Sequence, residues 1–259
     1  MTNTTLVTET VASAKPVSRK RTWKISYYDV LLNVTQFFGF STICLSGYYF
    51  NSTKYGMQWP KEEDIPSQKA ADYFHGFFMT LGLIFFQGEG LLSFRLYKNE
   101  QRFISKLIHL TLHSIAVGFL VTALVCIITA KSLKNEHHFT SFHGWFGLLT
   151  MLIYVVQFAF GFGHFCFPGV RLHVQSKLIP VHRFLGIVSF FACSIQVIVG
   201  HVQLYSWNGG NCSSLFGCDQ AVDLIYRILM ISLIIYAILV IFCVMTPKWR
   251  RTKSLNEEE

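Results

Sequence analysis

The sequence predicts an all-α integral membrane protein with six transmembrane helices. Hydrophobic residues make up 52% of the 259 residues and charged residues only 14%, whereas a soluble domain has about a quarter charged residues. Six apolar stretches each reach the roughly twenty residues that a helix needs to cross a bilayer. The net charge of +8 does not indicate nucleic-acid binding, because lysine and arginine gather beside the apolar stretches, where they orient a membrane protein.

The chain divides into a polar leader, one membrane domain and a short tail. Residues 1–26 form the leader, residues 27–246 the membrane domain with its functional core at 73–204, and residues 247–259 the tail. No cleavable signal peptide is expected, because the first apolar run lies behind the polar, basic leader. The six spans are expected at Tyr27–Phe50, Tyr73–Tyr97, Ile104–Ala130, His143–Phe167, Leu178–Leu204 and Val222–Met245.

The distribution of lysine and arginine predicts the orientation of the bundle. Most of these residues lie in the leader, in the loops after the second and fourth spans, and in the tail. The positive-inside rule places that side, with both termini, in the cytoplasm. On the other side lie two glycosylation sequons, at Asn51 and Asn211. Cys212 and Cys218 lie there too, and an oxidising compartment would allow them to form a disulfide.

Ionisable residues in membrane spans are costly and mark functional positions. Each of the four middle spans carries a histidine near one end: His75, His109, His143 and His182. In the predicted topology His75 and His143 lie near the non-cytoplasmic face, and the other two near the cytoplasmic face. Each depth thus holds two histidines from different helices, as a haem iron with two axial imidazoles requires. A central four-helix bundle meets this requirement twice, and two haem irons bound there would lie about 20 Å apart by the helical rise.

Geometry alone leaves other uses of these histidines open. A single histidine near a helix end is more often an interfacial residue than a ligand, and four of them would also suit a proton pathway or a divalent-metal transporter. His113 lies one turn beyond His109 on the same helix face. Histidines four residues apart can share one metal from the same side, but they cannot be the two axial ligands of one haem. One of the two therefore has another role.

The four middle spans resemble the cytochrome b561 family. The resemblance covers about residues 73–200 and rests on the segments HGFFMTLGLIFFQGEGLLSFR, KLIHLTLH, SFHGWFGLLTMLIYVVQFAFGF and LIPVHRFLGIVSF. It implies that His75 and His143 bind one haem, and His109 and His182 the other. It also implies a homodimeric oxidoreductase that takes electrons from cytoplasmic ascorbate. These electrons would cross the membrane to monodehydroascorbate or to ferric iron.

The resemblance and the charge pattern together predict a cytoplasmic donor site. The family's basic residues seven and three positions before the third-span ligand correspond to Arg102 and Lys106, and its arginine at the end of the second span to Arg95. Ascorbate is a monoanion at neutral pH, so cations beside a haem would attract and orient it. Where the family has an arginine seven residues before the fifth-span ligand, this chain has Gln175. Lys177, two residues later, is the candidate replacement.

On the opposite face, the loop between the third and fourth spans offers a second substrate site. The family has a histidine in this loop, and either His137 or His138 corresponds to it. The predicted environment is membrane lipid, in the plasma membrane or in the membranes of endosomes, lysosomes or secretory vesicles. A haem-free transporter of protons or divalent metal is the alternative interpretation of the same histidines.

Overall fold

The structure confirms the predicted fold class. The computed structural model describes residues 26–166, 171–209, 212, 216–218 and 220–249. Within these ranges, six helical spans are long and apolar enough to cross a membrane. The leader before residue 26, Phe167, Asn211 and the tail beyond residue 249 lie outside the described residues, so what was predicted for them stays a prediction.

The second of the six spans is interrupted by a stretch of π-helix. The helices are α1 (Tyr27–Asn51), α2 (Ile65–Met79), the π-helix η1 (Thr80–Phe86), α3 (Gln87–Leu96), α4 (Arg102–Leu133), α5 (Phe142–Phe165), α6 (Leu172–Trp207), α7 (Ala221–Met245) and the short 3-10 helix η2 (Pro247–Trp249). α2, η1 and α3 form one continuous span.

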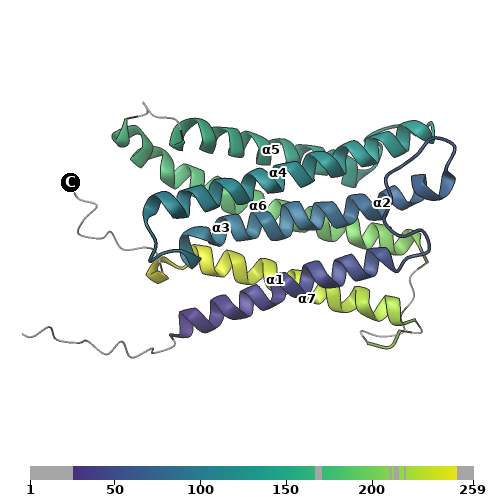
Figure 1. The fold of residues 1–259 in the computed structure, drawn as a ribbon, viewed down its shortest axis with the longest axis horizontal. Helices are drawn as coiled ribbons and strands as arrows, with labels where there is room; N and C mark the ends of the chain where they lie inside the picture. The colour runs from purple at the N-terminus through teal and green to yellow at the C-terminus, as the bar shows by residue number, and fades with distance from the viewer. Residues whose placement is uncertain (1–25, 167–170, 210–211, 213–215, 219, 250–259) are drawn as a thin grey trace, which may run out of the picture.

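The spans pack as three neighbouring pairs (Figure 1). α1 packs against α7, the second span packs against α4, and α5 packs against α6. In the view of Figure 1, α1 and α7 lie at one side of the molecule and α5 lies at the other. Consecutive spans run in opposite directions, as short connections between long helices require. The second and third of these pairs carry the four predicted histidine ligands.

The second span begins earlier along the chain than its apolar pattern predicted. It starts at Ile65 rather than at Tyr73. The Asp64 carboxylate caps this start by accepting a hydrogen bond from the Ser67 amide at 3.4 Å, and a proline lies in the first turn, as is common at helix starts. The first turns are polar, so hydropathy does not reveal them as part of the helix.

The π-helix replaces regular α-helix in the middle of the second span. Each of its turns takes one residue more than an α-helical turn. Gly82 lies within it and against α4, where an added Cβ would come 3.0 Å from the Ala116 carbonyl oxygen. At its start the Thr80 hydroxyl donates to the Gly76 carbonyl oxygen at 2.8 Å. The close approach of the two helices at Gly82 therefore depends on the absence of a side chain there.

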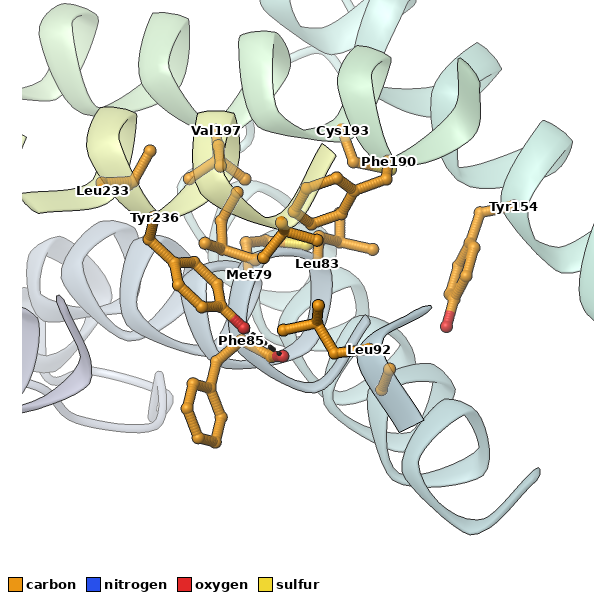
Figure 2. Close-up of a cluster of buried hydrophobic side chains, with 14 of the residues drawn as sticks. Met79, Leu83, Phe85, Leu92, Tyr154, Phe190, Cys193, Val197, Leu233 and Tyr236 are labelled. Atoms are coloured by element: carbon orange, nitrogen blue, oxygen red, sulfur yellow. Dashed lines mark hydrogen bonds between the residues drawn. The ribbon is translucent and has the colours of Figure 1, made fainter. Parts of the chain in front are cut away.

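A buried apolar cluster joins the second span to α6 and α7 (Figure 2). It includes Leu83 of η1, Phe190 of α6 and Tyr236 of α7. Beside it lies a buried carboxyl group, Glu89, which accepts a hydrogen bond from the Tyr236 hydroxyl at 2.8 Å. The Gln36 amide donates to both oxygens of the same carboxyl group, at 2.9 and 3.0 Å. Glu89 is therefore well supplied with hydrogen-bond donors inside the bundle.

The faces of α5 that turn away from the bundle are apolar. Leu149, Leu152 and Val156 are among its exposed side chains. Such surfaces meet lipid hydrocarbon in a bilayer, where an exposed apolar side chain costs nothing. Thr150 and Gln157 of the same helix are buried and face the interior instead.

Candidate functional site

Four histidine rings form two pairs inside the bundle, and the two rings of each pair come from different helices. His75 of α2 and His143 of α5 have ring centroids 6.5 Å apart, and His109 of α4 and His182 of α6 have ring centroids 6.3 Å apart. Two imidazoles on opposite sides of one metal ion have centroids about 6 Å apart, because each metal–nitrogen bond is about 2 Å and each nitrogen lies about 1 Å from its ring centroid. Both pairs have this separation.

Backbone carbonyl groups fix the proton on two of the four rings. His75 Nδ1 lies 3.0 Å from the Ala123 carbonyl oxygen of α4, and His109 Nδ1 lies 2.7 Å from the Gly90 carbonyl oxygen of α3. A carbonyl oxygen only accepts, so Nδ1 carries the proton and donates in both bonds. Nε2 then keeps its lone pair for a metal, as in metal-binding histidines generally.

The π-helix keeps these two contacts in register. Ala123 follows His109 by fourteen residues in α4, about 20 Å at the helical rise. Gly90 follows His75 by fifteen residues in the second span, which includes η1. Since a π-turn takes up one extra residue, the two antiparallel helices meet at both levels. The histidine of each helix thereby donates a hydrogen bond to a backbone carbonyl oxygen of the other helix.

The other two rings contact glutamines that the sequence-based prediction missed. The Gln196 side-chain nitrogen lies 2.9 Å from His143 Nδ1, and the Gln157 side-chain nitrogen lies 2.9 Å from His182 Nδ1. A repeat in the sequence would have revealed both glutamines, because α5 and α6 share the pattern His-x3-Gly-x9-Gln-x3-Gly. Its two copies cover His143–Gly161 and His182–Gly200.

The last glycine of each repeat leaves room for the ring on the opposite helix. A Cβ added to Gly200 would lie 2.7 Å from His143 Cε1, and one added to Gly161 would lie 2.7 Å from His182 Cε1. Both separations are far below van der Waals contact. The imidazoles of α5 and α6 therefore occupy space that any other residue at these positions would fill.

A cavity of about 450 Å³ opens beside the His75–His143 pair, which is within the usual size of a ligand pocket. Apolar side chains line much of it, Met79 and Leu148 among them, and the buried His201 also contributes. Each histidine pair supplies two metal ligands, which suits a group that brings its other ligands itself, as the four porphyrin nitrogens do. The residues present therefore fit a haem.

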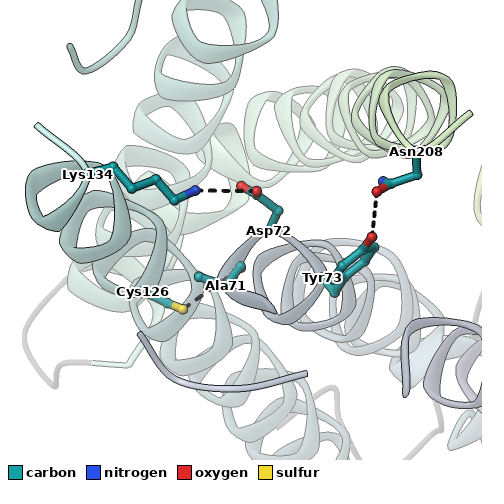
Figure 3. Close-up of polar contacts among 6 residues, drawn as sticks. All are labelled: Ala71, Asp72, Tyr73, Cys126, Lys134 and Asn208. Carbon is teal, nitrogen blue, oxygen red and sulfur yellow. Dashed lines mark hydrogen bonds and ion pairs between the residues drawn. The ribbon is translucent and has the colours of Figure 1, made fainter. Parts of the chain in front are cut away.

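Charged and polar side chains line the same cavity where the ends of α2 and α4 meet the α4–α5 loop. Lys134 forms an ion pair with Asp72, at 3.8 Å (Figure 3). His138 lines the cavity and lies 3.2 Å from the Ser132 hydroxyl. His137 is exposed and is not part of the lining. Of the two loop histidines, His138 is thus the one placed to meet a molecule in this cavity.

His113 lies beside the His109–His182 pair without being part of it. Its ring centroid is 4.4 Å from that of His109, and its Nδ1 lies 2.9 Å from the Tyr154 hydroxyl of α5. An added Cβ on Gly90 would come 2.6 Å from His113 Nε2, so this nitrogen packs against the α3 backbone. The ring that approaches His182 from α4 is that of His109.

The residues predicted to bind ascorbate share one end of the bundle. Arg102 is exposed in the first turn of α4, and the half-buried Lys106 lies one turn before His109. Lys177 is exposed on α6, ahead of His182. The Gln175 amide donates to the His164 carbonyl oxygen at 3.1 Å, so it joins the end of α5 to the start of α6.

Arg95, also predicted for the donor site, has a buried side chain that bonds to the end of α7. Its side chain is only 5% exposed, and its guanidinium donates to the Val244 carbonyl oxygen at 2.6 Å and to the Thr246 carbonyl oxygen at 3.3 Å. The last carbonyl groups of a helix have no partners within the helix, so Arg95 satisfies the end of α7. Tyr28 adds a bond from α1 to the Arg95 carbonyl oxygen at 2.9 Å.

Replacing Arg95 by methionine is expected to lower the free energy of unfolding by about 3 kcal/mol, because hydrogen bonds from a charged donor contribute about 1.5–3 kcal/mol each. Thermal unfolding of the detergent-solubilised protein measures this change. Arg102→Met, at an exposed position on the same end of the bundle, is the control and should alter stability little. Unchanged stability of Arg95→Met together with weaker reduction by ascorbate would instead return Arg95 to the donor site.

The loop between α6 and α7 contains a disulfide. Cys212 and Cys218 are bonded to each other, and the Tyr205 hydroxyl lies 3.4 Å from the Cys212 sulfur. Asn51, the sequon residue that the structure describes, is exposed at the end of α1. The disulfide and Asn51 lie at the end of the bundle that carries the His75–His143 pair.

The fold and the site together define a class of protein. It is a helical membrane protein with two candidate bis-histidine sites, each spaced for one iron. The family model described as "Eukaryotic cytochrome b561" matches residues 74–208, just over half of the chain. The chain belongs to the cytochrome b561 family. Membership implies that the protein binds haem b, to which the histidine pairs are suited.

Relatives of this chain include animal membrane reductases. A Caenorhabditis elegans homolog of transmembrane ascorbate-dependent reductase CYB561 is 28% identical over 243 residues, which are 91% of this chain and 89% of the relative. Human transmembrane ascorbate-dependent reductase CYB561 is 26% identical over 224 residues, 86% of this chain and 85% of the relative. Plasma membrane ascorbate-dependent reductase CYBRD1 of Xenopus tropicalis is 26% identical over 190 residues, 71% of this chain and 66% of the relative.

Proposed function

We propose that this protein carries electrons from ascorbate across a membrane through two haems b. The observation that carries the proposal is the placement of the two histidine pairs, His75 with His143 and His109 with His182, at two levels of one bundle. The names of the relatives, which are ascorbate-dependent reductases, support the choice of donor. Haem b at each pair would supply a one-electron carrier.

The protein's own residues hold and orient the ligands. The carbonyl groups of Ala123 and Gly90 keep the Nδ1 proton on His75 and His109 and leave Nε2 available. Gly161 and Gly200 make room for the other two rings. Because the bundle brings its ligands together by packing of long helices, little reorganisation is needed when the oxidation state changes.

Visible absorption and haem content test this proposal. Purified protein is expected to show a Soret band, to contain two haems per chain by the pyridine haemochrome assay, and to be reduced on addition of ascorbate. Colourless protein with haem available during expression would contradict the proposal and leave the haem-free transporter of protons or divalent metal. One haem per chain would leave one of the two histidine pairs without its proposed role.

The donor is proposed to bind at the end of the bundle with the His109–His182 pair. Arg102 and Lys106 lie on α4 just before His109, and Lys177 lies on α6 before His182. Cations attract the ascorbate monoanion toward the nearest haem edge. The buried Arg95 is left out of this set, because its guanidinium bonds to the end of α7.

Replacing Arg102 and Lys106 together by glutamine is expected to raise the ascorbate concentration that half-reduces the haems by roughly three- to tenfold, because an exposed ion pair contributes about 0.2–1 kcal/mol. The spectrum of the fully reduced protein should not change. The difference from wild type should shrink at high salt, since exposed charges are screened over about 10 Å at 0.1 M salt. Stopped-flow or equilibrium titration of haem reduction measures both effects.

Two further variants make that experiment specific. Lys54→Gln with Lys61→Gln removes the same charge from the exposed connector between α1 and α2, at the other end of the bundle, and should leave ascorbate reduction unchanged. Lys177→Gln should weaken reduction if this lysine replaces the arginine that the family has near Gln175. Unchanged reduction of the Arg102–Lys106 variant at low salt would show that ascorbate binds elsewhere.

The acceptor is proposed to be monodehydroascorbate or a ferric chelate, bound near His138 at the end with the His75–His143 pair. Orientation and acceptor can be tested together in sealed vesicles loaded with ascorbate, with ferric citrate and monodehydroascorbate compared outside. Cytoplasmic termini, with the His109–His182 end facing the cytoplasm, are part of the proposal. Digestion of the α3–α4 loop by protease added to the non-cytoplasmic side would reverse it. The homodimer and the choice of membrane stay predictions from the family resemblance.

A further inference from the structure

The four candidate haem ligands are held in two different ways. His75 and His109, on the second span and α4, donate from Nδ1 to backbone carbonyl oxygens. His143 and His182, on α5 and α6, contact glutamine side chains at Nδ1 instead. Each pair therefore combines one ring held by the backbone with one ring held by a side-chain amide, and the amide is the one of the two that a mutation can change.

Each glutamine amide is bound to a single histidine. The Gln157 side-chain nitrogen lies 2.9 Å from His182 Nδ1 and 2.6 Å from the His182 carbonyl oxygen. The Gln196 side-chain nitrogen lies 2.9 Å from His143 Nδ1 and 2.5 Å from the His143 carbonyl oxygen. Gln157 is 8% exposed, so its amide is buried next to the ring. A buried amide that contacts both the Nδ1 atom and the backbone carbonyl oxygen of one histidine limits the orientations of that ring.

A glycine on the opposite helix, from the other copy of the repeat, faces each amide. An added Cβ on Gly147 would lie 3.2 Å from the Gln196 side-chain nitrogen, and one on Gly186 would lie 3.7 Å from the Gln157 side-chain nitrogen. The repeat thus places four elements together twice: a histidine and a glycine on one helix with a glutamine and a glycine on the other. The same arrangement occurs at both levels of the bundle.

We propose that Gln157 and Gln196 are positioning residues, which fix the orientation and the proton of His182 and His143 and thereby set the reduction potentials of the two haem sites. The inference rests on the proposed function, in which these histidines bind iron. An imidazole that binds iron through Nε2 keeps its proton on Nδ1 and needs an acceptor there. The two ends of a glutamine amide exchange places by a half turn, so the side-chain oxygen accepts this proton.

The half turn requires the glutamine side chain to shift as well, because an amide oxygen in place of the nitrogen would lie 2.5–2.6 Å from the carbonyl oxygens of His143 and His182, and all of these oxygens are acceptors. It removes the amide donor from the carbonyl oxygens of His143 and His182. The His143 carbonyl group lies in the first turn of α5, and the His182 carbonyl group lies within α6. In an α-helix each carbonyl oxygen also accepts a hydrogen bond from the backbone amide four residues later. The state with iron therefore gains an acceptor for Nδ1 without leaving a backbone group unsatisfied.

Exchanging the amide for a carboxylate or for an apolar group tests the inference in both directions. Gln196→Glu supplies a stronger acceptor, makes the His143 imidazole more electron-donating and stabilises oxidised iron, so the midpoint potential of that haem should fall. Gln196→Leu removes the acceptor, so the same potential should rise. Gln157→Glu and Gln157→Leu should do the same to the haem bound by His182. Redox titration followed by visible absorption measures the potentials of both haems.

The two glutamines serve as controls for each other. Each variant is expected to shift one haem potential and to leave the other at its wild-type value. Electron paramagnetic resonance of the oxidised protein should show a changed low-spin signal for the same haem only, because this signal depends on ring orientation. Selective loss of that one haem in the leucine variant, with its retention in the glutamate variant, would also support a positioning role.

Three results would overturn the inference. These are two bound haems with unchanged potentials and signals in all four variants, equal shifts of both haems by one substitution, or a rise in potential on substitution by glutamate. A wild-type protein without haem would instead contradict the proposed function. The failure of one proposal can therefore be told from the failure of the other.

Discussion

Replacing His109 by alanine is expected to remove one haem and to leave the other in place. His109 and His182 are the rings that approach each other at one end of the bundle, with centroids 6.3 Å apart. Loss of one axial ligand leaves iron with a single protein bond, so His182→Ala should have the same result. The haem content should fall from two to one per chain, and the remaining haem should keep the spectrum and potential of the His75–His143 site.

His113→Ala is the matched control, because this histidine lies one turn away on the same helix. It should retain both haems, since its ring packs against Gly90 and Tyr154 rather than against His182. A shift in the potential of the nearby haem is compatible with this role. Loss of a haem in His113→Ala, with both haems kept in His109→Ala, would reverse the assignment.

Replacing Gly161 or Gly200 by alanine is expected to displace the imidazole ring of His182 or His143, respectively, while the histidine itself is unchanged. The added Cβ would lie 2.7 Å from His182 Cε1 in the first variant and 2.7 Å from His143 Cε1 in the second. Overpacking of this kind costs about 1–3 kcal/mol, and here the strain falls on a proposed iron ligand. Each variant should lose most of one haem, from the site of the displaced ring, and keep the other.

A neighbouring glycine supplies the control for backbone effects. Gly163 lies in the same helix as Gly161, and an added Cβ there meets no atom within 4 Å. Gly163→Ala should bind both haems and be as stable as the wild type or slightly more stable, since alanine favours helix over glycine by about 1 kcal/mol. Full haem content in Gly161→Ala and Gly200→Ala would show that the rings have another position when the haems are bound.

The sequence was sufficient for the fold because bilayer thickness sets the length of a span and hydrocarbon penalises polar groups. Six apolar stretches therefore appeared directly, and the histidines within them stood out. The starts of two helices did not. Residues 65–72 and 172–177 are helical in the structure, but their polar composition is equally typical of a loop. Asp64 caps the first of these helices, and Asp64 with Pro66 is a helix-start signal that hydropathy alone does not use.

The sequence pointed to the four histidines that the structure brings together in pairs, but not to their hydrogen-bond partners. A histidine in an apolar helix is rare enough to draw notice, whereas a glutamine such as Gln157 or Gln196 suits many interior positions. The repeat His-x3-Gly-x9-Gln-x3-Gly is the sequence signal that could have found them. Arg95 is ambiguous for a different reason. A cation at the end of a membrane span can orient the protein in the bilayer, bind a substrate or hydrogen-bond to the end of another helix. Only its contacts with Val244 and Thr246 distinguish these roles.

The π-helix has a consequence for how this bundle tolerates change in chain length. An extra residue in an α-helix turns everything beyond it by about 100°, which would carry Gly90 away from His109 and Arg95 away from α7. In η1 the extra residue is absorbed within one local widening, so both halves of the span present the correct face to their neighbours. The span thus behaves as two separately aligned helices joined by an adjustable segment. A deletion that returned Thr80–Phe86 to regular α-helix would therefore move Gly90 and Arg95 away from their partners.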